Sequence, residues 1–152
     1  MGVGAPLRAA TRSDGATALQ VQQLVDILRA RLGITAEVRA TIVDRDARTL
    51  SVQRDPRAPG TFALAVERGF AEGLSAVQLE AALAHELGHV WIYTHHPYLQ
   101  TEQLANRVAM RAVSRERLVE VYRTLWGAYA LHGSLEAFLG VEAPVTNTSA
   151  QQ

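Results

Sequence analysis

The chain has 152 residues and a formal net charge of zero, because 15 Lys and Arg are balanced by 15 Asp and Glu. That balance argues against nucleic acid or an anionic membrane as the main partner. The chain has no cysteine, which excludes disulfides and thiolate metal sites. No apolar run reaches the roughly 20 residues that a transmembrane helix needs. An apolar fraction of 48% is enough for one hydrophobic core.

The first elements are predicted from apolar spacing. Residues 1–15 show no period and are expected to be a flexible arm. Residues 17–32 carry apolar side chains at helical spacing, and Gly33 supplies a helix stop. A helix is therefore predicted to open the ordered part of the chain.

Three strands are predicted to follow. Residues 36–43 alternate between apolar and polar side chains, which is typical of a half-buried strand. Residues 49–53 are expected to be its hairpin partner. A loop with two prolines and a glycine, residues 55–60, leads to a third strand at residues 61–66.

The rest of the chain is predicted to be helical. Ser75 and Gln78 match a capping box, so a long helix should run from Ser75 to about Thr94. Further helices are expected at residues 100–114, 115–131 and 134–139, followed by a disordered tail at residues 141–152. Gly88 lowers helix propensity by up to about 1 kcal/mol relative to Ala. Its presence inside the long helix predicts close backbone packing there.

The long helix contains the motif His-Glu-x-x-His, formed by His85, Glu86 and His89. Residues four apart lie on one face of a helix, so both imidazoles can reach one metal ion. Glu86 can reach a metal-bound water without binding the metal. This combination is typical of zinc-dependent hydrolysis.

A catalytic zinc usually takes three protein ligands and leaves one position for water. Glu102 is the candidate third ligand, because it opens a helix that can return antiparallel to the motif helix. Asn106, one turn later, could orient a ligand histidine. The rival third ligands are His95 and His96. The alternative explanation for these two residues is structural, because the helix dipole favours histidine near a helix C-terminus.

The pair of motifs H-E-x-x-H and E-x-x-A-N resembles the gluzincin clan of zinc metallopeptidases over residues 61–111. The resemblance implies an α+β, zincin-like fold, in which a small mixed sheet has its edge strand above the motif helix. It implies one catalytic domain at residues 1–140, divided into subdomains at residues 16–96 and 97–140. The longer metzincin pattern is the minor alternative. It would use His95, but Ile92 stands where that pattern needs Gly.

The resemblance implies Zn²⁺ held by His85, His89 and Glu102, and a zinc-bound water activated by Glu86 for hydrolysis of peptide bonds. His132 is favoured as the donor to the oxyanion, with Tyr129, Tyr122 and Tyr98 as alternatives. The edge strand that binds an extended protein or peptide substrate would be the third strand, composed of Thr61, Phe62, Ala63, Leu64, Ala65 and Val66.

Two other functions fit the same sequence. One is a zinc-binding regulatory or sensor module with little proteolytic activity, working with a partner. The other is a structural domain with an accidental motif. The small second subdomain raises the possibility of latency through the N-terminal arm. The compartment is left open between the cytoplasm and, for a chain separated from a leader or anchor, the cell exterior.

Overall fold

A computed structural model describes residues 16–46, 48–126 and 134–140 of the chain. They form an α+β fold, as the sequence predicted, with a three-stranded sheet and several helices. The elements in chain order are α1 (Ala18–Leu32), β1 (Glu37–Val43), β2 (Leu50–Arg54), β3 (Thr61–Glu67), α2 (Arg68–Glu72), α3 (Ala76–His95), η1 (Pro97–Leu99), α4 (Glu102–Ala109), α5 (Arg115–Val121), η2 (Tyr122–Trp126) and α7 (Leu135–Leu139).

Some sequence predictions lie outside the described residues. They are the flexible arm at residues 1–15, the disordered tail at residues 141–152, and the residues Tyr129 and His132. Within the part of the chain that the structure describes, no helix is both long enough and apolar enough to cross a bilayer.

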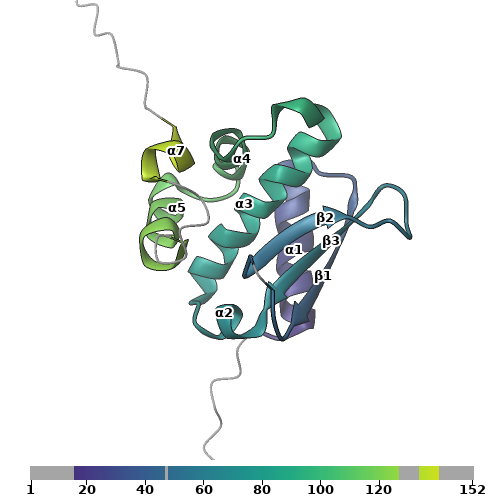
Figure 1. The fold of residues 1–152 in the computed structure, drawn as a ribbon, viewed down its shortest axis with the longest axis horizontal. Helices are drawn as coiled ribbons and strands as arrows, with labels where there is room; N and C mark the ends of the chain where they lie inside the picture. The colour runs from purple at the N-terminus through teal and green to yellow at the C-terminus, as the bar shows by residue number, and fades with distance from the viewer. Residues whose placement is uncertain (1–15, 47, 127–133, 141–152) are drawn as a thin grey trace, which may run out of the picture.

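The motif helix α3 lies at the centre of the molecule. Figure 1 shows the sheet and α1 on one side of α3, and α4, α5 and α7 on the other. The capping box predicted at its start is present, because Ser75 accepts from Gln78 N and Gln78 reaches back to Ser75 N. These bonds satisfy orphan donors of the first turn and fix where α3 begins.

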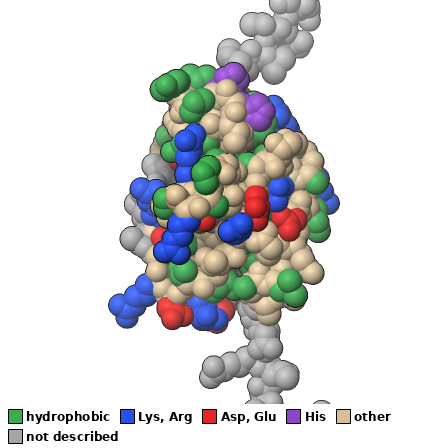
Figure 2. All heavy atoms as spheres, turned by 90° about the vertical axis from the view of Figure 1, so that its right-hand side faces the viewer, with side chains coloured by type: hydrophobic (Ala, Val, Ile, Leu, Met, Phe, Trp, Pro, Cys, Tyr) green, Lys and Arg blue, Asp and Glu red, His purple; other side chains and the backbone are tan. Residues whose placement is uncertain are grey.

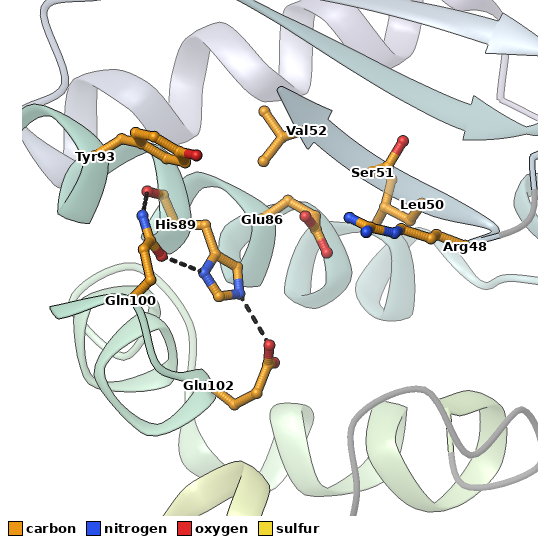
Figure 3. Close-up of a pocket in the computed structure, with 9 residues that line it drawn as sticks. All are labelled: Arg48, Leu50, Ser51, Val52, Glu86, His89, Tyr93, Gln100 and Glu102. Atoms are coloured by element: carbon orange, nitrogen blue, oxygen red, sulfur yellow. Dashed lines mark hydrogen bonds and ion pairs between the residues drawn. The ribbon is translucent and has the colours of Figure 1, made fainter. Parts of the chain in front are cut away.

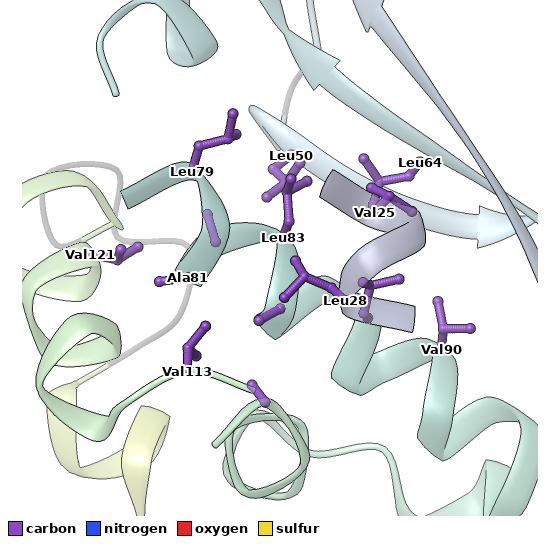
Figure 4. Packing of buried hydrophobic residues seen from close by; sticks show 14 of the residues in the cluster. Val25, Leu28, Leu50, Leu64, Leu79, Ala81, Leu83, Val90, Val113 and Val121 are labelled. Atoms are coloured by element: carbon purple, nitrogen blue, oxygen red, sulfur yellow. The ribbon is translucent and has the colours of Figure 1, made fainter. Parts of the chain in front are cut away.

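The hydrophobic core runs along both sides of α3. On the sheet side, Leu83 packs in one cluster with Leu28 and Leu64, and on the other side Ala81 lies toward Val121 (Figure 4). Eleven residues of α3 are buried, including His85 and Glu86. A helix that is buried on nearly all faces can hold polar side chains only where other elements supply partners.

The sheet order is β1–β3–β2, which corrects two sequence predictions. Residues 49–53 were predicted to pair with the first strand, but β2 pairs antiparallel with β3. Residues 61–66 were predicted to be the edge strand, but β3 is central and pairs with β1 as well. The physical reason is composition. Residues 61–66 carry no charge, as suits a strand enclosed on both sides, whereas β2 ends in Gln53 and Arg54 and tolerates an edge.

The two edges of the sheet differ. At β1, the side chain of Gln22 on α1 donates to Val38 O at 2.9 Å and accepts from Ala40 N at 2.7 Å. Gln22 thereby satisfies two main-chain groups on the outer side of β1, those of Val38 and Ala40. The opposite edge is β2, which lies beside α3.

The helices after α3 begin and end differently from the prediction. The predicted helix at residues 100–114 is shorter, because Thr101 caps α4 by accepting from Leu104 N, and Ser114 caps the next helix. The short helix α2 was not predicted. The last described helix, α7, begins after the cap Ser134 and matches the prediction.

Helices α3 and α4 approach closely at Gly88, as the sequence predicted. A Cβ atom placed on Gly88 would lie 2.2 Å from the carbonyl oxygen of Ala105. Ala105 is itself fully buried. Because Gly88 and Ala105 are both small, α4 can bring its first turn close to the face of α3 that carries the histidines.

We predict that Gly88→Ala destabilises the protein, although Ala is the better helix former by about 1 kcal/mol. The new methyl group must displace the α4 backbone, and overpacking of this kind costs about 1–3 kcal/mol. Urea denaturation measures the free energy of unfolding. The matched control is Gly69→Ala in α2, where the nearest atom would be 3.7 Å away and no loss is expected. A Gly88→Ala protein as stable as the parent would contradict the close approach.

Candidate metal centre

The three predicted ligands come together in the structure. His85 and His89 project from adjacent turns of α3, and Glu102 opens α4 opposite them. The carboxylate of Glu102 lies 2.8 Å from His85 Nε2 and 3.3 Å from His89 Nε2. One potential ligand atom from each residue lies within 4.8 Å of the other two. These three residues, which we call the metal group, could hold a metal ion.

The orientation of His85 is fixed by Asn106. The Nδ1 atom of His85 lies 2.8 Å from Asn106 Oδ1, and the Asn106 amide nitrogen donates to the main-chain carbonyl of Phe138. Because that carbonyl can only accept, it sets which end of the Asn106 amide is oxygen. The amide oxygen can likewise only accept, so His85 Nδ1 carries the hydrogen. The role predicted for Asn106, a hydrogen bond to a ligand histidine, agrees with this geometry.

A second carboxamide does the same for His89. The Nδ1 atom of His89 lies 2.8 Å from Gln100 Oε1, and Gln100 Nε2 donates to the main-chain carbonyl of His89 at 3.0 Å. Figure 3 shows both contacts between Gln100 and His89. The carbonyl again fixes the orientation of the amide, so the hydrogen of His89 is assigned to Nδ1. Gln100 has no place in either sequence motif, and its position just before a helix gave no signal of this role.

These tautomers explain why the group suits a cation. With hydrogen on both Nδ1 atoms, each neutral ring presents the lone pair of Nε2 toward the carboxylate of Glu102. Lone pairs and a carboxylate repel one another unless a proton or a metal ion lies between them. Two imidazole nitrogens and one carboxylate are a donor set that suits several divalent transition metals.

Burial acts differently on the two histidines. His85 is fully buried, and this burial lowers its pKa despite the hydrogen bond to Glu102. Burial also lowers the pKa of His89, but the hydrogen bond to Glu102, the charge of Glu86 and the hydrogen bond to Gln100 outweigh it, so that this pKa is raised.

Glu86 lies beside the metal group without belonging to it. Its side chain is 6% exposed, and burial raises its pKa to about 7, with further contributions in the same direction from Glu102 and Asp46. The charges of His89 and Arg48 act in the opposite direction. Figure 3 shows the carboxylate of Glu86 between His89 and Arg48. A carboxyl group with this pKa can accept or release a proton near neutral pH.

The metal group opens onto a cavity of about 430 Å³. The edge strand β2 forms one wall and α3 another, while Gln100 and Glu102 close the side toward α4 (Figure 3). The lining residues are Arg48, Leu50, Ser51, Val52, Glu86, His89, Tyr93, Gln100 and Glu102. Of these, the sequence analysis had not singled out Arg48, Tyr93 or Gln100. On the face shown in Figure 2, acidic, basic and hydrophobic side chains are intermixed.

The strand that lines the cavity is β2 and not β3. The predicted substrate-binding residues of β3 are Thr61, Phe62, Ala63, Leu64, Ala65 and Val66. The prediction placed them at the edge beside the cleft, and this placement is wrong, because neighbours on both sides occupy the main-chain groups of β3. Leu50, Ser51 and Val52 lie there instead.

The rival ligand His95 lies elsewhere. Its ring stacks on Trp91 at a centroid distance of 4.0 Å, and its Nδ1 lies 2.8 Å from Trp91 O. The metal group therefore contains Glu102 and not His95. Among the alternative oxyanion donors, Tyr98 is 98% exposed, and the ring of Tyr122 lies 5.1 Å from that of Phe138.

Helix α7 completes the surroundings of His85. The ring of Phe138 lies 5.0 Å from the ring of His85, and the main-chain carbonyl of Phe138 orients Asn106. Phe138 is fully buried. A residue 53 positions after His85 thus shields the His85 ring from water.

Comparison of the chain with protein-family models, with curated proteins and with solved structures gives no match. The geometry of the site is therefore the basis for inferring a function.

Proposed function

We propose that this protein is a zinc-dependent metallopeptidase of gluzincin type. The observation that carries the proposal is the convergence of His85 Nε2, His89 Nε2 and the carboxylate of Glu102 beside a buried carboxyl group, Glu86, at one wall of a cavity. Two imidazoles and one carboxylate are a ligand set found in catalytic zinc sites. Catalytic sites use three protein ligands and leave a position for water or substrate.

In this proposal His85, His89 and Glu102 hold Zn²⁺. The metal would lower the pKa of a bound water to about 7 and polarise the carbonyl of a peptide bond. Asn106 and Gln100 keep both Nε2 lone pairs directed at the metal. Outer partners of this kind raise metal affinity by about 10–100-fold.

Glu86 acts as the proton carrier in the proposed reaction. Its carboxylate lies on the cavity wall next to His89, one residue after the first ligand, and therefore faces the space where water and substrate meet. It would accept, on a carboxylate oxygen, the proton that the attacking water loses, and would later give this proton to the amine that leaves as the C–N bond breaks. Burial raises the pKa of the Glu86 carboxyl group, which favours the uptake of a proton by this carboxylate.

The edge strand β2 is the proposed guide for the substrate. It pairs with β3 on one side, and residues 50–52 lie along the cavity on the other. An extended peptide can add to such an edge through main-chain hydrogen bonds. At the other edge, Gln22 of α1 already occupies two main-chain groups of β1, and the cavity lies along β2, so β2 is the proposed edge for a peptide.

We expect the parent protein to bind about one zinc per chain. Glu102→Ala should weaken zinc binding by at least about 10-fold, because it removes one of three ligands and leaves two lone pairs without a carboxylate. Elemental analysis and a competition titration with a chromophoric chelator measure this. His95→Ala is the matched control, a histidine of the same helix outside the metal group, and should bind zinc as the parent does. Equal loss in both variants, or none in either, would contradict the ligand set.

We expect Glu86→Gln to keep its zinc and to lose peptidase activity by at least about 100-fold, since general acid–base catalysis contributes about 10²–10⁴-fold. Mass spectrometry of a digested peptide mixture measures cleavage. Glu80→Gln, on the same helix but paired with Arg31 and Arg117 on the surface, should retain full activity. A Glu86→Gln protein with parental activity would exclude the mechanism. A zinc-loaded parent that cleaves no peptide would favour the regulatory module.

A further inference from the structure

Arg48 is the only Lys or Arg among the described residues that line the cavity. Figure 3 shows its guanidinium beside the carboxylate of Glu86, at the opposite end of the cavity from Tyr93. Its positive charge lowers the pKa of Glu86. Among the described residues, Arg48 forms no ion pair within 4.0 Å. The side chain is exposed to the cavity and to solvent. Its five N–H donors are therefore available to a ligand.

The backbone that carries Arg48 is held in a strained turn. Thr49 has φ 62°, a left-handed conformation that a β-branched residue rarely adopts. Leu50 N donates to Arg48 O at 2.6 Å, which closes a tight three-residue turn just before β2. Strain of this kind persists only where the surroundings impose it, and it concentrates at binding sites.

Asp46 imposes this turn. Its carboxylate accepts from Arg48 N at 2.7 Å and from Ser51 Oγ at 2.9 Å, and its carbonyl accepts from Thr49 N at 3.1 Å. The carboxylate of Asp46 is thus committed to the turn itself. The consequence is that Arg48 is fixed at the start of the edge strand, with its side chain at the mouth of the cavity.

The charges of the site favour an anionic group next to Arg48. If the site holds Zn²⁺ as proposed, the two charges of the ion would offset the carboxylates of Glu86 and Glu102, and Arg48 would be the one charge among the described lining residues without an opposite charge in the lining. Guanidinium binds carboxylates in a planar, two-pronged arrangement that matches their geometry.

We propose that Arg48 selects the substrate of this site, by pairing with a carboxylate of a peptide that lies along β2. This inference rests on the proposed peptidase function and adds the substrate class. The carboxylate has two possible sources, the free C-terminus of the peptide or the side chain of an acidic residue. Both present the same chemistry to the guanidinium, and labelled peptides distinguish them.

The test measures binding to the zinc-loaded full chain in the Glu86→Gln background, where peptides are not turned over. The probe is a fluorescein-labelled hexapeptide of alanine and serine with one central phenylalanine. It is made with a free C-terminal carboxylate, with an amidated C-terminus, and as amidated forms in which one glutamate is moved through the positions. Fluorescence anisotropy gives the dissociation constant of each form. The additional variants are Arg48→Gln and, as the matched control, Arg57→Gln in the exposed loop between β2 and β3.

We expect one carboxylate form to bind at least about 10-fold more tightly than the neutral amidated peptide, which corresponds to about 1.4 kcal/mol. The form that does so identifies the source. Arg48→Gln should abolish this ratio, and Arg57→Gln should keep it. The proposal is overturned if no carboxylate form exceeds the neutral peptide, if the ratio survives in Arg48→Gln, or if zinc-loaded protein binds none of the peptides. Failure of the peptidase function itself appears separately, as a zinc-loaded protein with Glu86 intact that cleaves nothing.

Discussion

The site depends on two carboxamides that are each oriented by a main-chain carbonyl. The carbonyl of Phe138 orients Asn106, and the carbonyl of His89 orients Gln100. Each amide oxygen then fixes the hydrogen of one histidine on Nδ1. The remaining Nε2 lone pairs converge on the carboxylate of Glu102. Without these bonds, either ring could turn its N–H toward the carboxylate and satisfy it with no cation.

The fold serves this arrangement through one close crossing. Gly88 and Ala105 let α4 approach α3 closely enough for Glu102 to reach both histidines across the gap. Gly88 lowers the helix propensity of α3, but it permits the close approach that brings Glu102 to the two histidines. The strain at Thr49 is a second local cost, and it fixes the start of the edge strand at the same cavity. Both departures from local preference lie at the site, where such conflicts are expected.

Features carried by a motif could be predicted from the sequence, including the meeting of His85, His89 and Glu102, whereas the order in which the strands pair could not. The capping box at Ser75 and the contact at Gly88 follow from neighbouring residues and were confirmed. The choice of β2 as the edge strand depends on how three strands pair, which periodicity does not encode. Gln100 lies before a helix and belongs to no recognisable motif. Arg48 lines the cavity next to Thr49, whose backbone is left-handed. The sequence does not predict this conformation, because a β-branched residue such as threonine rarely adopts it.

The most direct test of this account is the tautomeric state of His85 and His89. Two-bond ¹H–¹⁵N correlation NMR of ¹⁵N-histidine-labelled protein, with Asn106→Ala and Gln100→Ala variants for assignment, distinguishes hydrogen on Nδ1 from hydrogen on Nε2. The account predicts that in the zinc-loaded protein both rings carry hydrogen on Nδ1, and that the Nε2 resonances of these two histidines alone shift as zinc is added to one equivalent. Hydrogen on Nε2 in either ring, or shifts at His95 and His96 instead, would contradict it.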